Sequence, residues 1–409
     1  MRRLFLVLLL LALATGALAR ENYNLTGQGA RAMGMGGAFI GIADDATAIS
    51  WNPAGLAHLD RPEVSGAFKY ETQKTGWDPK SYTSLGQIYT LGEDQNDSHF
   101  VLNFASGVFP LKLKQRNLVL ALAYQQQLDF FGIDSPDTIE TYKQSGGANT
   151  LSPGLAYRIT PKFAVGGAVN YWTGATIGNY TNSTDPSLNY QAKQPYSGLN
   201  FTFGGWGYAN PVKLGAVLRT PLTLKYHNEF TGSSALVYPR RPVSGEYKAK
   251  FPFMFGVGLG WEINPNLTLA ADVDFRPYSG MERQDSAGVA DTSFHPMSII
   301  QIHLGAEHMV RLRTGTVGLR LGFRTDPRTY TGYRVDQNGM LRSNDKQVSG
   351  LVFSCGSGFT AKHFRLDGAF EYGSVKAPLE FHPSILISEK NFNFIESSMR
   401  ILLSGSVRF

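Results

Sequence analysis

The chain has 409 residues, a net charge of +6, one cysteine and only 17% charged residues. Soluble domains carry about 25% charged residues, so we expect much of this surface to face something other than water. One cysteine excludes a disulfide framework, and the absence of a block of basic and aromatic residues argues against nucleic acid as a partner.

The first nineteen residues have the pattern of a secretory signal peptide. Arg2 and Arg3 precede an apolar run at residues 4–13, and small residues follow at Ala17 and Ala19. The run is too short for a spanning helix, and no later window supplies the roughly eighteen apolar residues in succession that such a helix needs. We predict cleavage after Ala19, which leaves an exported chain without a lipid anchor.

Residues 20–62 are rich in glycine and show no alternation of polar and apolar residues. Within them, residues 27–32 fit the loose G-x-G-x-x-A pattern of dinucleotide-binding loops. No strand precedes this match, no βαβ unit follows it, and export removes the chain from cytosolic nucleotides. We therefore expect a separate N-terminal unit at 20–62 that binds no cofactor.

From residue 63 onward the dominant signal is strict alternation, which is typical of strands whose two faces meet different surroundings. Three segments show it clearly, at residues 267–276, 316–324 and 364–372. In the first, Leu269 and Val273 share one face, while Asp272 and Asp274 share the other. The charged faces of the three segments together predict these residues in a polar barrel interior: Asp272, Asp274, Arg320, Arg324, Arg365, Asp367 and Glu371.

Weaker alternation predicts eleven further strands, which bring the total to fourteen. They are expected at residues 64–70, 99–107, 117–127, 150–159, 162–174, 197–206, 211–226, 248–262, 298–308, 347–359 and 397–409. An even number of antiparallel strands, joined alternately by short periplasmic turns and long outer loops, is typical of bacterial outer-membrane barrels. We therefore predict an all-β fold, a transmembrane barrel of fourteen antiparallel strands over residues 63–409.

The connections between these strands alternate in length as that fold requires. Short turns are expected around Pro161, Pro211, Pro265, Leu312 and Lys362. Long outer loops are expected at residues 71–98, 128–149, 175–196, 227–247, 277–297, 326–346 and 376–396. The last strand ends on Phe409, a terminal aromatic residue that resembles the signal read by the barrel-assembly machinery. Lipid and lipopolysaccharide of the outer membrane are the expected surroundings.

The segment at residues 29–57 resembles the N-terminal hatch of the FadL/TodX family of outer-membrane hydrocarbon transporters. The resemblance rests on three groups of residues: Gly36 and Gly37; Asp44 and Asp45; and Asn52, Pro53 and Ala54. Members of that family have fourteen strands, so the resemblance implies that residues 20–62 fold into the lumen of a monomeric barrel as a plug. Asp44 and Asp45 are expected to pair there with lumen-facing arginines, among Arg320, Arg324, Arg365 and Arg400.

Two branches of this architecture remain open on the residues alone. About nine residues separate the predicted cleavage site from Gly29, a shorter lead-in than the fatty-acid transporters carry. The W-N-P-A-G-L-A motif at residues 51–57 also resembles PorV-like barrels, which are adaptors for protein secretion. The leading interpretation is a channel for passive uptake of long-chain fatty acids or aromatic hydrocarbons, and the alternative is a secretion adaptor.

Catalytic and metal-binding patterns are missing from the sequence. The eight histidines form no H-E-x-x-H motif and have no cysteine partners, and no G-x-S-x-G elbow occurs. We therefore expect no enzyme activity, no metal and no source of energy, so that transport runs down a gradient.

Two features are candidates for the path of a hydrophobic ligand. An apolar cluster in the second outer loop either captures the ligand or packs over the barrel mouth, and it consists of Leu128, Phe130, Phe131 and Ile133. Prolines interrupt otherwise regular strands at Pro153, Pro221 and Pro252, where ladder pairing is expected to fail. In the family that the hatch resembles, a strand kink opens a lateral exit into the bilayer. Each proline is a candidate for that role, and the alternative is an ordinary bulge of the barrel wall.

Overall fold

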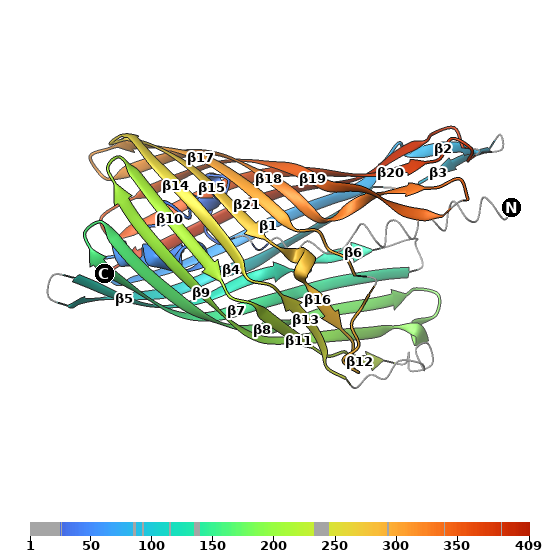
Figure 1. Ribbon diagram of the computed structural model, residues 1–409, viewed down its shortest axis with the longest axis horizontal. Helices are drawn as coiled ribbons and strands as arrows, with labels where there is room; N and C mark the ends of the chain where they lie inside the picture. Colours follow the sequence, from blue (N-terminus) through green and yellow to red (C-terminus); the bar gives the residue numbers. More distant parts are fainter. Residues whose placement is uncertain are drawn as a thin grey trace.

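The protein is a closed antiparallel β-barrel of fourteen crossings, seen side-on in Figure 1. The computed structural model describes residues 25 and 27–409, except 85–86, 92–93, 114–115, 135–139, 233–244, 293, 339 and 386. The predicted signal peptide at residues 1–19 lies outside the described residues. None of the described helices combines the length and the apolar character needed to cross a membrane.

Nine of the fourteen crossings are single long strands, and they lie on either side of the junction where the first strand pairs with the last. They are β1 (Glu63–Asp78), β4 (Gln95–Leu113), β7 (Glu140–Thr160), β8 (Phe163–Asn182), β9 (Tyr190–Ala209), β18 (Thr316–Val335), β19 (Leu341–Thr360), β20 (Phe364–Phe381) and β21 (Asn391–Arg408).

The other crossings are shorter or are interrupted. They are β5 (Arg116–Asp129) with β6 (Gly132–Asp134), β10 (Val212–Arg219) with β11 (Leu222–Tyr226) and β12 (Glu229–Gly232), β13 (Tyr247–Phe251) with β14 (Met254–Asn264), β15 (Leu267–Arg276) with β16 (Glu282–Gln284), and β17 (Ile299–Arg311). A separate hairpin of β2 (Ser81–Ser84) and β3 (Gln87–Thr90) lies in the first outer loop.

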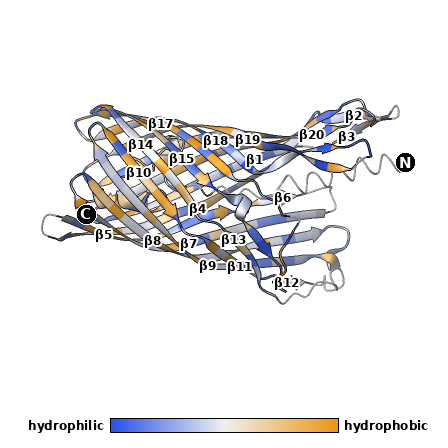
Figure 2. Cartoon of the chain, viewed as in Figure 1, coloured by the Kyte–Doolittle hydropathy of each residue, from blue (hydrophilic) through white to orange (hydrophobic). Residues whose placement is uncertain are grey.

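Alternation along the strands separates lipid-facing from interior side chains. On β15, Leu269 and Val273 are exposed, whereas Asp272 and Asp274 are buried. Figure 2 shows hydrophobic positions recurring along the strands over the middle of the barrel. Because lipid offers no hydrogen-bond partner, the sheet must close on itself, and β1 pairs along its length with both β4 and β21. The predicted fold and strand count are thereby confirmed.

The lengths of the strands differ from the prediction. The long link expected at residues 175–196 is largely strand, because β8 continues to Asn182 and β9 starts at Tyr190. The links expected at 326–346 and 376–396 shrink in the same way. Above the membrane both faces of a strand meet a polar environment, so alternation disappears while the hydrogen-bonded ladder continues.

The three interrupting prolines have different effects. Pro221 separates β10 from β11, and Pro252 separates β13 from β14. These two breaks face each other, because the ladder resumes on one side with Arg219↔Met254 and on the other with Leu222↔Phe251. Pro153 leaves β7 continuous, although the register between β7 and β8 skips it.

The N-terminal segment, here residues 27–62, packs against the inner wall near the end that carries the short turns (Figure 1). It contains α2 (Ala30–Gly34), α3 (Ala48–Trp51) and the 3₁₀ helix η1 (Pro53–His58). Helix α2 contacts β18 to β21, and η1 contacts β7, β8 and β9 on the other side. Nearly every residue from 27 to 59 is buried, and its apolar side chains form one core with inward alanines of the wall.

Candidate functional site

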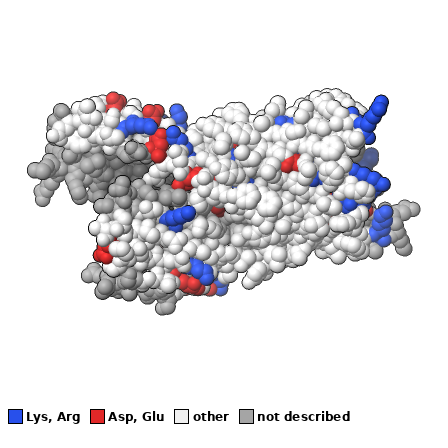
Figure 3. All heavy atoms as spheres, turned by 180° about the vertical axis from the view of Figure 1, so that it is seen from behind, with Lys and Arg blue, Asp and Glu red and all other residues white. Residues whose placement is uncertain are grey.

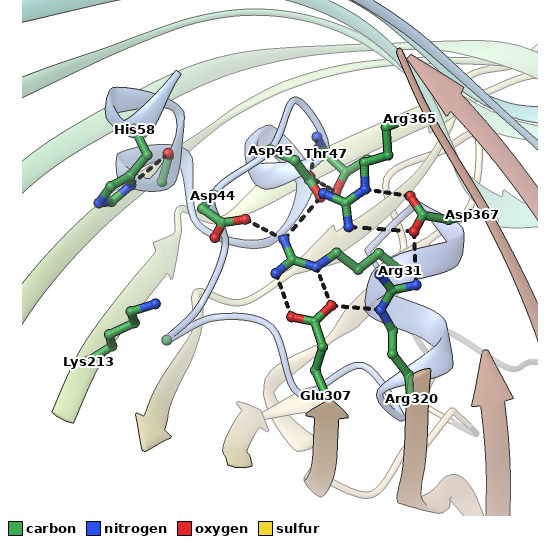
Figure 4. A network of polar contacts seen from close by, with 12 residues as sticks. Arg31, Asp44, Asp45, Thr47, His58, Lys213, Glu307, Arg320, Arg365 and Asp367 are labelled. Carbon is green, nitrogen blue, oxygen red and sulfur yellow. Dashed lines mark hydrogen bonds and ion pairs between the residues drawn. The ribbon is translucent and has the colours of Figure 1, made fainter. Parts of the chain in front are cut away.

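A buried network of charged side chains joins the N-terminal segment to the barrel wall (Figure 4). At its centre, Arg31 of α2 donates to both carboxylate oxygens of Glu307 on β17, at 2.9 and 2.8 Å. The same guanidinium pairs with Asp44 and lies 3.5 Å from Asp45. A planar guanidinium has five donors in fixed positions, so it can satisfy three carboxylates at once.

The wall extends this network through two further arginines. Arg320 lies between Glu307 and Asp367, at 2.7 and 2.8 Å. Arg365 reaches Asp367 at 2.7 Å and Asp45 at 3.6 Å. Glu307 and Asp367 are therefore each shared by two cations, and three arginines serve four carboxylates within the network. Charges in such a dry interior are tolerated only when they are paired in this way.

The pairing expected from the sequence differs from that observed for one of the two aspartates. Asp45 meets Arg365, one of the arginines proposed for it. Asp44 instead pairs with Arg31 of its own segment. Burial acts to raise the pKa of Asp44, but the nearby cations Arg31 and Lys213 outweigh it, so the pKa is lowered and the carboxylate is charged.

Two further interior arginines form ion pairs away from the N-terminal segment. Arg324 pairs with Glu371. Arg400 lies 2.7 Å from Glu71 and 3.7 Å from Glu371. Four arginines were proposed as partners for the aspartates. Two of them, Arg324 and Arg400, belong to a second group of charges, which lies farther from the short turns than the first.

Polar side chains of the wall also hold the backbone of the loop after α2. Asp272 accepts hydrogen bonds from the amides of Phe39 and Ile40, at 2.5 and 2.6 Å. The Nδ1 atom of His303 lies 2.7 Å from the carbonyl oxygen of Gly36 and Ser354 accepts from the Gly36 amide at 2.9 Å. Asp274 stands behind His303, at 3.3 Å from its Nε2 atom.

The second motif of the segment contacts the opposite wall. The side-chain amide nitrogen of Asn52 donates to the carbonyl oxygens of Ile40 and Gly205, both at 3.0 Å. Its side-chain oxygen accepts from the amide of Ala54, which caps η1 together with Pro53 at the first helical position. Asn52 therefore links two parts of the segment to β9.

A pocket opens above α3, between the N-terminal segment and the wall. The space between its lining atoms amounts to about 520 Å³, a figure that includes open solvent. Its apolar lining comprises Leu25, Ile49, Leu128, Trp172, Leu222, Phe251 and Met254. Its polar lining comprises Ser50, Gln125, Gln127, Asn170, Asn200, Thr202, Arg219 and Thr220.

Most of the polar lining of the pocket is satisfied by internal hydrogen bonds. Asn170 donates to Asn200 at 3.3 Å and to Thr202 at 2.9 Å, and the indole of Trp172 donates to Asn200 at 2.8 Å. An apolar guest therefore does not strip these groups of partners, which is the main cost of burying polar atoms. Gln125 keeps one side-chain oxygen without a partner in the part of the chain that the structure describes.

Arg219 is the one cation among the lining residues. It stands at the end of β10, immediately before the break at Pro221, and donates to the carbonyl oxygen of Ser50 at 2.9 Å. Within the described residues no carboxylate lies within ion-pair distance of it. A guanidinium with free donors beside an apolar pocket can bind the charged head of an amphiphile.

The barrel wall loses its ladder between β4 and β5, a place named here the β4–β5 seam. Pairing between the two strands ends at Phe104↔Gln125. Beyond that point, residues 95–102 of β4 pair with β1, and residues 126–129 of β5 pair with β7. Gln28 of the N-terminal segment bridges the gap, because it donates to the Gln126 carbonyl at 2.7 Å and accepts from Asn103 at 2.6 Å.

Side chains also span the seam at its outer end. The Nε2 atom of His99 on β4 lies 2.6 Å from Asp129 on β5, and the ring of Phe131 stacks on His99. Glu71 joins His99 and Asp129 in a group whose ligand atoms lie within 4.8 Å of one another. Lys69 donates to both carboxylates at 2.7 Å, so a resident ammonium already supplies the positive charge that a metal would bring.

The apolar cluster predicted to capture a ligand divides between the pocket and the seam. Leu128 lines the pocket, and Phe130 packs beside it against Tyr196. Phe131 covers His99 at the seam. Ile133 lies on β6, opposite Lys143 of β7.

Three residues important to this site were missed by the sequence analysis. Glu307 lies an even number of residues after His303 and Gln301. Because side chains alternate along a strand, all three point to the same face, and Glu307 could have been predicted to point inward. Arg31 is the sole Lys or Arg between residues 21 and 60, an isolated charge that signals a buried partner. No local signal marks Arg219, because its role depends on the chain break that follows it.

Comparisons with known proteins identify the architecture. Residues 7–295 match the model of a family described as outer membrane protein transport protein (OMPP1/FadL/TodX). The search of curated proteins finds no match.

Solved structures with the same fold include a FadL homologue and two toluene transporters. A FadL homologue of Pseudomonas aeruginosa superposes with a TM-score of 0.63 and 14% identity, over 94% of this chain and 98% of that one. The toluene transporter TbuX of Ralstonia pickettii has a TM-score of 0.60 and 14% identity, with coverages of 95% and 100%. The toluene transporter TodX of P. putida also gives 0.60 and 14%, with coverages of 94% and 99%. The chain is an outer-membrane β-barrel that belongs to the OMPP1/FadL/TodX family of transport proteins.

Proposed function

We propose that this barrel admits hydrophobic small molecules that carry an anionic head, such as long-chain fatty acids, across the outer membrane. The observation that carries the proposal is the pocket, where seven apolar side chains lie beside Arg219. Burial of an apolar tail gains about 25 cal/mol per Å². A carboxylate held by a guanidinium fixes the orientation of the molecule. No group in this pathway supplies energy, so uptake follows the gradient.

The N-terminal segment serves as the plug that separates this pocket from the periplasm. Its support is the ring of contacts described above, in which Arg31, Asn52 and the loop at residues 36–40 each bind a different part of the wall. A solute that leaves the pocket downward must displace these contacts together. Movement along the strand axis is therefore costly, and a sideways route is favoured.

The β4–β5 seam is the proposed sideways route into the bilayer. Leu102 and Phe100 are exposed beside it on β4, so it opens at the level of the lipid. Gln125, Gln127 and Leu128 line the pocket just behind its β5 edge. The breaks at Pro221 and Pro252 are weaker candidates, because the ladder resumes on both sides of them.

Binding of oleate and of toluene to the purified barrel, followed by the fluorescence of Trp172, tests the substrate class. Arg219→Gln is expected to weaken oleate binding by roughly tenfold or more, since a charge-assisted hydrogen bond contributes about 1.5–3 kcal/mol. Toluene binding should not change. Lys213→Gln is the matched control, because Lys213 pairs with Glu262 and does not line the pocket. Equal binding of oleate to the wild type and Arg219→Gln would assign the pocket to uncharged hydrocarbons.

The secretion-adaptor interpretation receives no support from the comparisons, whose descriptions name transport proteins and channels. Uptake by a strain that lacks its own transporter separates the two roles. A channel restores growth on oleate when this barrel is expressed, whereas an adaptor does not.

A further inference from the structure

The periplasmic end of the barrel carries a set of exposed cations on its short turns. Figure 3 shows Lys and Arg side chains gathered at this end, whereas the central band of the same face is nearly free of charge. The exposed members, named here the basic rim, are Arg61, Lys112, Lys162, Arg311, Arg313 and Lys362.

The basic rim is an arc and not a complete ring. In the order of the strands around the barrel, Arg311 and Arg313 on the β17–β18 turn are followed by Lys362 on the β19–β20 turn. Arg61 before β1 and the turns after β4 and β7 continue the same arc. The two remaining turns, at residues 210–211 and 264–266, carry only asparagine and proline.

The charges of the basic rim are not balanced by the protein. No member forms an ion pair with a carboxylate among the residues that the structure describes. Asp60 is the one exposed carboxylate on the described short turns. The neighbouring Arg408 differs, because it is paired with Glu63. Six exposed cations without an ion-pair partner among the described residues therefore lie at this end of the barrel.

Three turns of the rim also touch the lipid-facing surface. Leu312 is 51% exposed between Arg311 and Arg313, and Phe163 is 44% exposed directly after Lys162. Phe364, two residues after Lys362, is 41% exposed. Long basic side chains beside apolar residues at a membrane boundary place their charged ends at the level of the lipid headgroups.

We propose that the basic rim binds the phosphate groups of anionic phospholipids, such as phosphatidylglycerol, in the inner leaflet of the outer membrane. The apolar residues of the same turns contact the acyl chains, so the site is built for a lipid and not for a free anion. The neutral turns at residues 210–211 and 264–266 leave one side of the barrel without this lipid.

Native mass spectrometry of the purified barrel with dioleoyl phosphatidylglycerol, with phosphatidylethanolamine, or with inorganic phosphate tests the proposal. The test variant combines Lys162→Gln, Arg311→Gln, Arg313→Gln and Lys362→Gln. The control variant removes four exposed cations at the outer end that have no ion-pair partner among the described residues. It combines Lys143→Gln, Arg334→Gln, Lys346→Gln and Lys376→Gln.

The wild type and the control are expected to retain phosphatidylglycerol in preference to phosphatidylethanolamine. A cation near an anionic surface contributes about fivefold in affinity, so the test variant should bind phosphatidylglycerol at least tenfold more weakly. Equal binding by the test variant, equal loss in the control, or displacement of the lipid by equimolar inorganic phosphate would overturn the proposal. If the fourfold variant does not fold, Arg311→Gln with Arg313→Gln is measured instead, with an expected loss of at least threefold.

Discussion

Arg31 and Glu307 face each other through two hydrogen bonds of 2.9 and 2.8 Å, although 276 positions separate them in the chain. One belongs to the N-terminal segment and the other to the tenth crossing of the wall. Both are buried, so water cannot replace either partner. The seating of the segment therefore depends on this pair more than on any exposed contact.

Removal of this pair is expected to loosen the plug. Arg31→Met leaves the buried Glu307 with Arg320 as its one remaining cation and removes the ion-pair partner of the half-exposed Asp44. Because Glu307 stays partly compensated, we expect a cost below the roughly 3–5 kcal/mol of a buried ion pair that is fully broken on one side. We expect a larger single-channel conductance and faster proteolysis of residues 27–62. Arg342→Met, which breaks the exposed pair with Asp336, is the control and should change neither. Unchanged conductance and proteolysis in Arg31→Met would contradict this role.

Two glycines of the wall provide a matched test of close packing against the plug. A Cβ atom on Gly215 would overlap the carbonyl group of Ile40, whereas one on the nearby Gly205 meets no atom within 4 Å. Gly215→Ala is therefore expected to displace the loop at residues 36–40 and to lower the unfolding temperature, because the backbone has no room to yield. Gly205→Ala should behave as the wild type. Equal unfolding temperatures of the two variants would show that the loop does not press on the wall.

The pH dependence of the plug is expected to come from His58. Its Nδ1 atom lies 3.0 Å from the carbonyl oxygen of Gly55, and its ring meets the indole of Trp206 edge-on at 4.2 Å. Burial lowers the pKa of His58 below 6.5. Arg158 and Lys213 lower it further, and Asp44 opposes them.

The sign of the effect follows from this lowered pKa. The pKa of His58 is about 6.5 in the unfolded chain and lower in the folded chain. Between these two values the unfolded chain binds more protons than the folded one, so the stability of the plug falls as the pH drops through about 6.5. Proteolysis of residues 27–62 should therefore accelerate between pH 7.5 and pH 5, with a parallel loss of Trp206 fluorescence. His58→Gln should flatten this part of the pH profile. A variant with the same profile as the wild type would assign the effect to other groups.

The sequence predicted the fold because lipid and a polar lumen impose opposite demands on successive residues of each strand. That rule alone places Leu269 on the lipid-facing side of the strand and Asp272 in the interior. Strand ends could not be predicted in the same way, because β8 continues to Asn182 where neither face meets lipid. The alternation of residues along the strands also predicted that the side chains of Arg320 and Glu371 point inward, but it did not indicate their partners.

The details of the site depend on contacts between distant parts of the chain. Whether Asp44 binds Arg31 or an arginine of the wall is decided by where α2 sits, which no local pattern records. The β4–β5 seam is equally hidden. Its edge at Gln125 continues a regular strand, and only the change of partner from β4 to β7 exposes the gap that Gln28 fills.

A hydrophobic molecule is proposed to leave the lumen through the β4–β5 seam. The most direct test is uptake of radiolabelled oleate by cells that express a cysteine pair, His99→Cys with Asp129→Cys, joined by a short bis-thiol reagent. The exposed Cys355 is first replaced by serine. The control pair, Phe109→Cys with Leu120→Cys, joins the same strands where their ladder is already closed.

We predict that cross-linking the seam reduces oleate uptake at least tenfold while oleate binding persists, and that cross-linking the control pair has no effect. Undiminished uptake through a cross-linked seam would rule out this route.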